Sequence, residues 1–278
     1  MIPIRTLFTI GTIYFQLNEI NSQSIFNPIK APGLSGIGGQ SVVSKSAEAF
    51  QGNASNLASI KNSTLSFNGE SRFVGSGIAG SSILAGIKLG PYNGLGLSTV
   101  YYGLAEYNQL NLMAGYGMYL SKQIAIGTSG GMVHFNNPSG DKTTLGMISF
   151  GIQYQVFANL HLGVSYQRLL AHHSLQGKTA GNALLIGTRY SLSTLVSVYT
   201  EIEKDRFSKA NIKAGIEYQM MNSFIIRTGV TSYPQSFSSG MGVALNSLIY
   251  LDTSFSFYQS IGFTPALGIK FHFNKPSE

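Results

Sequence analysis

The stretch Ala266-Leu267-Gly268-Ile269-Lys270-Phe271-His272-Phe273 alternates without interruption between apolar residues and polar or small ones. Side chains of a β-strand point to opposite faces with a period of two, so this stretch predicts a strand with one apolar and one polar face. The apolar face comprises Leu267, Ile269, Phe271 and Phe273, and the other face carries Lys270 and His272. A late strand of this kind is typical of the seam of an outer-membrane β-barrel, where the apolar face contacts lipid or a partner protein.

Composition favours such a barrel over other classes of protein. Charged residues make up 10% of the chain and hydrophobic residues 44%, whereas soluble domains carry roughly 25% charged residues. No window reaches the roughly 18 consecutive apolar residues of a membrane helix. The net charge of +7 comes from scattered Lys and Arg without a basic run, so no nucleic-acid partner is expected. The absence of Cys excludes disulfides and thiolate metal sites.

Between residues 62 and 273 the chain divides into about fourteen segments, each long enough to span a bilayer as a tilted strand. The alternation is plain where Ile212, Ile216 and Tyr218 fall on one face while Lys213 and Glu217 fall on the other. We therefore predict an all-β fold, a transmembrane antiparallel up-and-down β-barrel of about 14 strands. A soluble all-β protein is the structural alternative, because an apolar strand face can also point to a shared core.

The connections between these segments alternate in length. Every second one is short and built on turn formers, as in Pro91-Tyr92-Asn93 and Met221-Asn222. Those between them are longer and more polar, and they include 136–141, 171–181, 205–208 and 232–239. Outer-membrane barrels have short periplasmic turns and longer outer loops, so we expect both termini on the periplasmic side.

The chain before the barrel divides into two parts. Residues 1–23 begin with Arg5 and a short apolar run, which predicts an export signal to the bacterial envelope; a buried first strand is the alternative. Residues 24–61 are rich in Gly, Ser and Asn and show no sustained period. In front of a barrel of residues 62–273, they are expected to fold into the lumen as a plug or to form a flexible periplasmic lead. Residues 274–278 form a C-terminal tail.

A short pattern in residues 37–58 resembles a known family. It contains Ile37-Gly38-Gly39, Ala47 and Ala49, and then Asn53-Ala54-Ser55-Asn56-Leu57-Ala58. This is similar to the N-terminal signature of the FadL-like outer-membrane proteins, and more closely to its PorV/PorQ branch in the type IX secretion system of Bacteroidetes. The resemblance implies a plugged barrel without catalytic chemistry. Ala54 and Asn56 depart from the proline and glycine of the pattern, and the plug signature comprises Gly38, Gly39, Ala47, Ala49, Asn53, Asn56 and Leu57.

No group of residues in the sequence suggests catalysis, a cofactor or a metal, so we expect a protein that is not an enzyme. The polar strand faces near the C-terminus carry charges of both signs, which either pair to fill the lumen and anchor the plug or line a path for a polar solute. We favour pairing, because inward charges of opposite sign tend to pair. These residues are Glu201, Glu203, Lys213, Glu217, Arg227, Lys270 and His272.

Two functions remain open at this stage. The resemblance implies an accessory barrel of a type IX-like secretion or cell-surface attachment complex, partnered by other envelope proteins and by the C-terminal domains of cargo. The alternative is a FadL-like transporter of hydrophobic small molecules, with an apolar pocket beside the plug. The short polar loops favour the first. A general porin would conflict with a plugged lumen.

Overall fold

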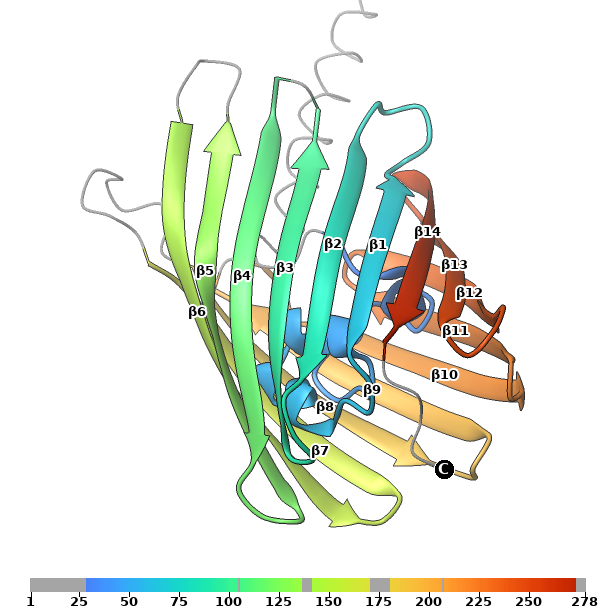
Figure 1. Ribbon diagram of the computed structural model, residues 1–278. Helices are drawn as coiled ribbons and strands as arrows, with labels where there is room; N and C mark the ends of the chain where they lie inside the picture. The colour runs from blue at the N-terminus through green and yellow to red at the C-terminus, as the bar shows by residue number, and fades with distance from the viewer. Residues whose placement is uncertain (1–28, 105, 137–141, 171–180, 207, 274–278) are drawn as a thin grey trace, which may run out of the picture.

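The computed structural model describes residues 29–104, 106–136, 142–170, 181–206 and 208–273. They form a closed barrel of 14 antiparallel strands, each paired with its neighbours in the chain, and the first strand pairs with the last (Figure 1). The predicted all-β barrel and its number of strands are thus confirmed. The predicted export signal 1–23 and the tail 274–278 lie outside the described residues.

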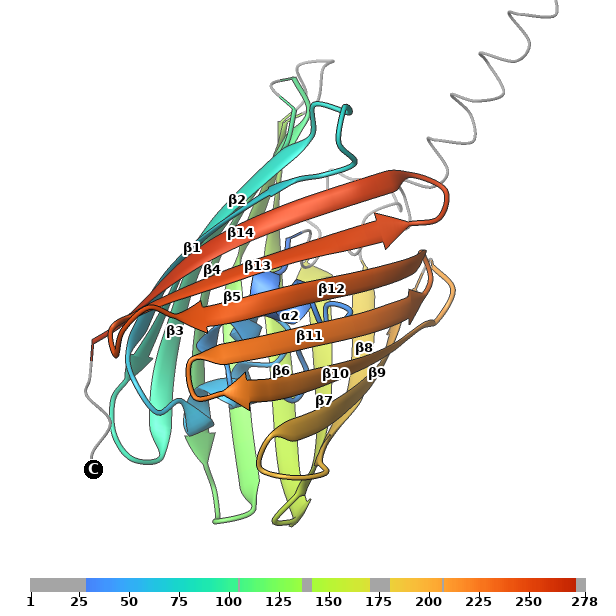
Figure 2. The same cartoon turned by 90° about the vertical axis from the view of Figure 1, so that its right-hand side faces the viewer.

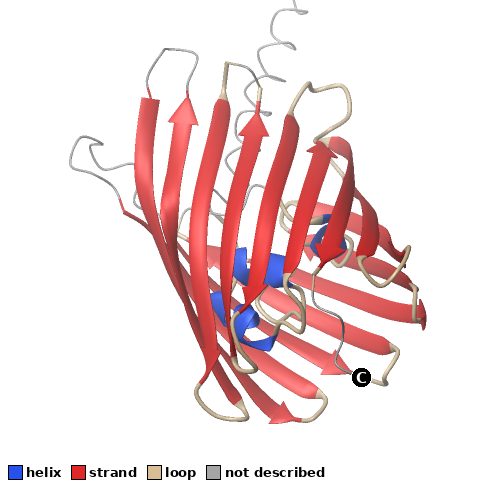
Figure 3. Cartoon of the chain, viewed as in Figure 1, coloured by secondary structure: helices blue, strands red, loops and turns tan. Residues whose placement is uncertain are grey.

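The regular elements of the barrel follow one another with short connections. The strands are β1 (Thr64–Ser71), β2 (Ala79–Lys88), β3 (Asn93–Gly103), β4 (Asn108–Tyr119), β5 (Ile124–Asn136), β6 (Lys142–Phe157), β7 (Leu160–Leu170), β8 (Asn182–Ser191), β9 (Val196–Asp205), β10 (Asn211–Met221), β11 (Phe224–Ser232), β12 (Gln235–Ala244), β13 (Ile249–Tyr258) and β14 (Gly262–His272). The short helices α2 (Pro32–Ser35), η1 (Ala47–Gln51) and η2 (Ala54–Ser59) precede them (Figure 3). Within the described residues, no helix is long and apolar enough to cross a membrane.

The seam of the barrel is the pairing of β1 with β14, which carries most of the stretch 266–273. Leu65 lies opposite Phe271, and Phe67 lies opposite Ile269. The rings of Phe67 and Phe271 meet edge to face with their centroids 6.3 Å apart, a favourable arrangement for two aromatic side chains. The closing strand therefore pairs the free edge that β1 would otherwise expose.

The two faces of the wall differ in polarity as the alternation predicts. Large apolar side chains are exposed on the outer face of every strand, among them Ile83, Phe150 and Phe237. On β14, Leu267 is exposed whereas Lys270, on the other face, is buried in the lumen. Apolar side chains outside and polar ones inside are the distribution of a barrel whose wall faces lipid.

The connections define two ends of the barrel. We call the turn end the one that carries residues 89–92 and 222–223, and the loop end the one that carries 72–78 and 259–261. The predicted loop 232–239, at the loop end, is wrong, because β11 ends at Ser232 and β12 begins at Gln235. Ser236 and Ser238 are buried on the inner face. A polar lumen accepts these serines within a strand, although the same composition is typical of a loop.

Replacing Ile269 with Lys is expected to hinder insertion, because a Lys on the lipid face near the bilayer midplane costs roughly 2–4 kcal/mol. Ile269 lies opposite Phe67 and Leu251, away from the strand ends. The measurement is the amount of heat-modifiable, folded barrel in outer-membrane fractions. Phe273→Lys, at the rim where the cost falls to roughly 0–1 kcal/mol, is the matched control. Equal insertion of the two variants would show that this face does not contact lipid.

Candidate functional site: the barrel lumen

Residues 29–61, here called the luminal segment, lie within the ring of strands and are mostly buried (Figures 1 and 2). Polar side chains cap the first turns of η1 and η2. The hydroxyl of Ser46 accepts the N–H of Glu48 at 3.3 Å, and the side-chain oxygen of Asn53 accepts the N–H of Ser55 at 3.0 Å. Such caps satisfy N–H groups that have no partner within the helix.

Asn56 holds two parts of the luminal segment together. Its side-chain nitrogen donates to the carbonyl oxygens of Ser41 at 2.8 Å and Ala49 at 3.2 Å. Its side-chain oxygen accepts the N–H of Ser44 at 2.9 Å and the Gln153 amide of the wall at 2.6 Å. The family signature has glycine at this position, and glycine has no side chain to make these hydrogen bonds. Asn56 in place of glycine therefore adds hydrogen bonds between parts of the fold.

Glycines of the wall allow the luminal segment to approach the strands. A Cβ on Gly215 would lie 2.5 Å from the carbonyl oxygen of Ile37, and one on Gly96 would lie 2.9 Å from the ring of Phe50. On β5, a Cβ on Gly127 would overlap the backbone of Ala54. The glycine-rich character of the strands, visible in the sequence, thus has a packing reason: the segment lies where side chains of the wall would otherwise be.

The residues of the plug signature lie on this contact surface. Gly38 and Gly39 have φ angles of +80° and +73°, in the left-handed region that favours glycine. A Cβ on Gly229 of the wall would overlap the backbone of Gly38. The remaining members, all buried or packed against the wall, are Ala47, Ala49, Asn53, Asn56 and Leu57.

Glu201 of β9 joins the wall to the luminal segment. One carboxylate oxygen accepts the backbone N–H groups of Ser41 at 2.7 Å and Val42 at 2.9 Å. The other pairs with Nζ of Lys213 at 2.7 Å, and Lys213 also pairs with Glu203 at 2.6 Å. Glu201 is 2% exposed. Charged hydrogen bonds of this kind are stronger than neutral ones, so a buried carboxylate with three donors is a firm anchor.

A second chain of ion pairs crosses the strands and also ends on the luminal segment. Arg227 pairs with Glu217 at 2.7 Å and with Asp252 at 2.6 Å. Lys270 pairs with Asp252 at 2.7 Å and with Glu48 of η1 at 2.7 Å. Asp252, which is fully buried, thus lies between two cations.

The predicted polar residues therefore fall into two sets of ion pairs. Glu201, Glu203 and Lys213 form the first, and Glu217, Arg227 and Lys270 belong to the second. His272 has no place in either chain of ion pairs; its Nδ1 lies 3.2 Å from the Thr64 hydroxyl. Sequence reasoning missed Asp252 and Glu48 as members. Asp252 alternates with apolar residues on β13, and this alternation predicts that its side chain faces the lumen. Glu48 lies outside the strands, where alternation gives no signal.

Cavities lie on both sides of the luminal segment. Toward the loop end, a cavity of about 140 Å³ is lined by Lys30 and Arg72 among others. Burial, together with the positive charge of Lys213, lowers the pKa of Lys30 to about 8. Toward the turn end, a larger cavity of about 620 Å³ is lined by Lys45 and Arg189 among others. Across the described parts of the chain, no three His, Asp or Glu side chains gather to hold a metal.

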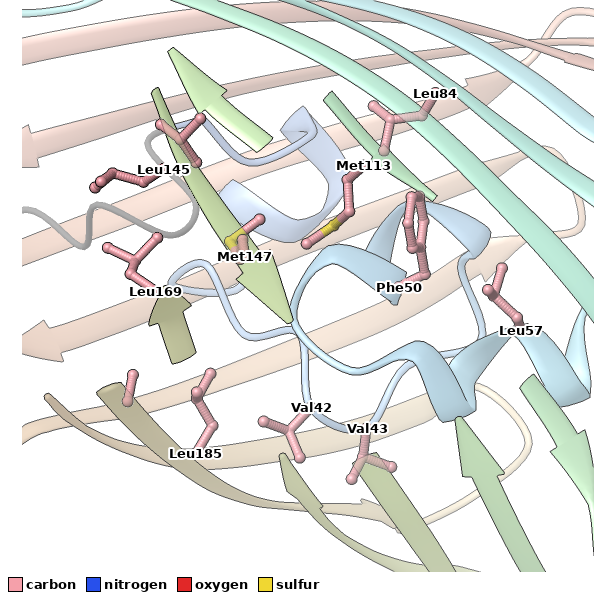
Figure 4. Close-up of a cluster of buried hydrophobic side chains, with 12 residues drawn as sticks. Val42, Val43, Phe50, Leu57, Leu84, Met113, Leu145, Met147, Leu169 and Leu185 are labelled. Carbon is pink, nitrogen blue, oxygen red and sulfur yellow. The ribbon is translucent and has the colours of Figure 1, made fainter. Parts of the chain in front are cut away.

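The lumen also has an apolar side, which we call the apolar wall. Figure 4 shows Met113 between Met147 and Phe50 of the luminal segment, within one cluster of buried side chains. These side chains come from β2 and β4–β8, whereas the ion pairs of the two chains above come from β9–β11, β13 and β14. The apolar wall consists of Leu84, Met113, Val133, Leu145, Met147, Leu169, Ala183 and Leu185, which pack with Val42, Val43, Phe50 and Leu57 of the luminal segment.

Solved structures of the same shape identify the fold. The chain superposes on the toluene transporter TbuX of Ralstonia pickettii with a TM-score of 0.67 and 11% identity, over 88% of this chain and 98% of that one. For the P. putida toluene transporter TodX the TM-score is 0.69 with 10% identity, over 88% and 99%. For a Pseudomonas aeruginosa FadL homologue it is 0.63 with 11% identity, over 90% and 99%. The fold is that of the FadL-type barrels.

At 10–11% sequence identity, the superposition shows that the fold is shared, and it does not show that the activity is shared. No family model matches the sequence, and no curated protein does. The coarser part of the expected resemblance, to FadL-like barrels, is thus supported by shape. The structures named above are those of toluene transporters and of a FadL homologue, and they give no support to the PorV/PorQ branch or to type IX secretion.

Gly127→Ala is expected to loosen the luminal segment, because the added methyl group overlaps the backbone of Ala54. Overpacking of this kind typically costs about 1–3 kcal/mol. Hydrogen exchange of the amides in residues 53–58 should accelerate. Gly130→Ala on the same strand is the control, because its Cβ would lie 3.7 Å from the nearest atom. Unchanged exchange in the Gly127 variant would contradict the tight fit.

Glu201→Gln should detach the luminal segment near Ser41, because the amide removes the charge that Lys213 and two N–H groups share. Breaking one partner of a buried ion pair costs roughly 3–5 kcal/mol. Limited proteolysis within residues 41–46 measures the loss. Glu217→Gln is the comparison, since its carboxylate contacts the wall residues Arg227 and Tyr199. Equal protease resistance of the two variants would contradict an anchoring role for Glu201.

Proposed function

We propose that this protein is a bacterial outer-membrane channel for hydrophobic small molecules. The observation that carries the proposal is the apolar wall, because the inner faces of β2 and β4–β8 carry aliphatic and Met side chains, buried against the luminal segment, where a porin has polar ones. Proteins of the same fold include toluene transporters and a monoaromatic hydrocarbon channel. The outward apolar faces and the even strand number support an outer-membrane location.

An apolar wall favours apolar solutes for a simple reason. Burial of apolar surface contributes about 25 cal/mol per Å², so a solute that covers roughly 100 Å² gains about 2.5 kcal/mol. Met113 and Met147 suit solutes of varied shape, because Met side chains are flexible and polarisable. The charged side of the lumen is occupied by its own ion pairs, so an apolar solute would be held between the apolar wall and the luminal segment that packs on it.

The outer surface carries a related feature. An apolar depression of about 420 Å³ lies over β2–β5, with Ile83 and Leu112 at its border and Gly130 and Gly131 in its lining. Met113 of the apolar wall lines the same depression. The strand ladder is continuous here, since Met113 lies opposite Gly131. At this place small residues thin the wall between two apolar surfaces, one in the lumen and one facing lipid.

Uptake of radiolabelled toluene by cells that express the protein tests the proposal. The double variant Met113→Gln/Met147→Gln should lower the rate roughly tenfold, because a buried amide without a partner costs about 1–3 kcal/mol. Phe157→Gln, an exposed residue where β6 ends at the turn end of the barrel, should leave the rate unchanged. Succinate uptake serves as the hydrophilic reference. The same toluene uptake with and without the protein would refute the channel.

The accessory role in a type IX-like secretion complex is the second proposal. It rests on the signature from Gly38 to Leu57, whose residues pack in the lumen. This proposal expects other envelope proteins and the C-terminal domains of cargo as partners, with both termini on the periplasmic side. Crosslinking and affinity purification from a Bacteroidetes outer membrane would recover such partners if it holds. Recovery of the barrel without secretion components or cargo, together with measurable toluene uptake, would favour the channel over the accessory role.

A further inference from the structure

Arg189 is a buried cation without an anionic partner. It lies on β8 with 6% of its surface exposed and lines the cavity of about 620 Å³ at the turn end. One terminal nitrogen lies 3.4 Å from Nδ1 of His161, and the buried Nε has no hydrogen-bond partner. Within the described residues, no carboxylate lies within ion-pair distance of this guanidinium. A buried charge in this state is costly unless a ligand supplies the missing partner.

A second cation of the same cavity comes from the luminal segment. Lys45 lines the cavity, and no carboxylate of the described chain pairs with it. Lys45 is exposed at the cavity; partial desolvation and the positive charges of Arg189 and Lys61 lower its pKa, and the charge of Glu217 opposes this shift. Two parts of the fold, the wall and the luminal segment, thus present positive charge to one space.

The carboxylates of this cavity do not neutralise these cations, because they are engaged elsewhere. Glu48 pairs with Lys270 at 2.7 Å. Glu217 pairs with Arg227 at 2.7 Å and accepts the hydroxyl of Tyr199 at 3.3 Å. The positive charge of Arg189 in this cavity is therefore not neutralised by any carboxylate of the described residues.

We propose that the turn-end cavity is a binding site for a small oxyanion, a carboxylate or a phosphate, held by Arg189 with Lys45 as the second positive group. A guanidinium offers parallel N–H donors that match both groups. The cavity of about 620 Å³ has room for a molecule of the size of benzoate. The site stands apart from the proposed channel function, since no residue of the apolar wall lines this cavity.

Isothermal titration of the full-length protein in a non-ionic detergent tests the site with three probes. Sodium benzoate and inorganic phosphate supply the two oxyanions, and benzyl alcohol is the neutral analogue of benzoate. Arg189→Gln should weaken oxyanion binding about tenfold or more, because it removes charged hydrogen bonds. Lys45→Gln should weaken it several-fold, and Arg189→Lys should restore part of it. Lys30→Gln, which changes a lysine of the other cavity, should bind the oxyanions with the affinity of the wild-type protein.

The outcomes separate the possibilities. Binding of benzoate without phosphate assigns the site to carboxylates, and the reverse assigns it to phosphates. The proposal is overturned if the unchanged protein binds neither oxyanion at millimolar concentration, or binds benzyl alcohol as well as benzoate. Unaltered affinity in a folded Arg189→Gln variant also overturns it. If that variant does not fold, as its heat-modifiable mobility would reveal, Lys45→Gln decides in its place. Toluene uptake is measured separately, so failure here leaves the channel proposal unaffected.

Discussion

The close approach between the luminal segment and the barrel wall determines much of this structure. Backbone atoms of residues such as Ile37 and Ala54 lie where a Cβ of the wall would be, and glycines such as Gly215 and Gly127 leave that space empty. Interiors of proteins are packed without room for an extra methyl group. The strands can therefore accept the segment only with glycine at these points, and the glycines in turn leave the wall without side chains of its own there.

Buried carboxylates complete this attachment with directional bonds. Glu201 binds two N–H groups of the luminal segment and Lys213, and Lys270 connects Asp252 with Glu48. A charge in the lumen is costly when it lacks a partner, and here the partners come from both the wall and the segment. Glycine packing places the segment, and the ion pairs fix its register along the barrel. Arg189 is a buried cation of the wall that lacks such a partner, which is why it points to a ligand.

The lumen that results has two chemically different sides. Strands β9–β11, β13 and β14 supply the ion pairs, and β2 with β4–β8 supplies the apolar wall. The luminal segment contacts both, through Val42 and Phe50 on one side and Glu48 on the other. A hydrophobic solute and an oxyanion would therefore be held by different parts of one barrel, since the first is attracted by buried apolar area and the second by fixed charge.

The sequence by itself determined the barrel, its closing strand and the direction of its faces, because a period of two in polarity is a local property of each strand. It placed Glu201 and Lys270 in the lumen for the same reason, and it failed at residues 232–239, where inward serines have the composition of a loop. Only the tertiary structure decided that Glu48 completes an ion-pair chain, that Asn56 holds the luminal segment together and that Met113 meets Met147. These contacts join residues far apart in the chain, and no local pattern records which side chains a closed barrel brings together.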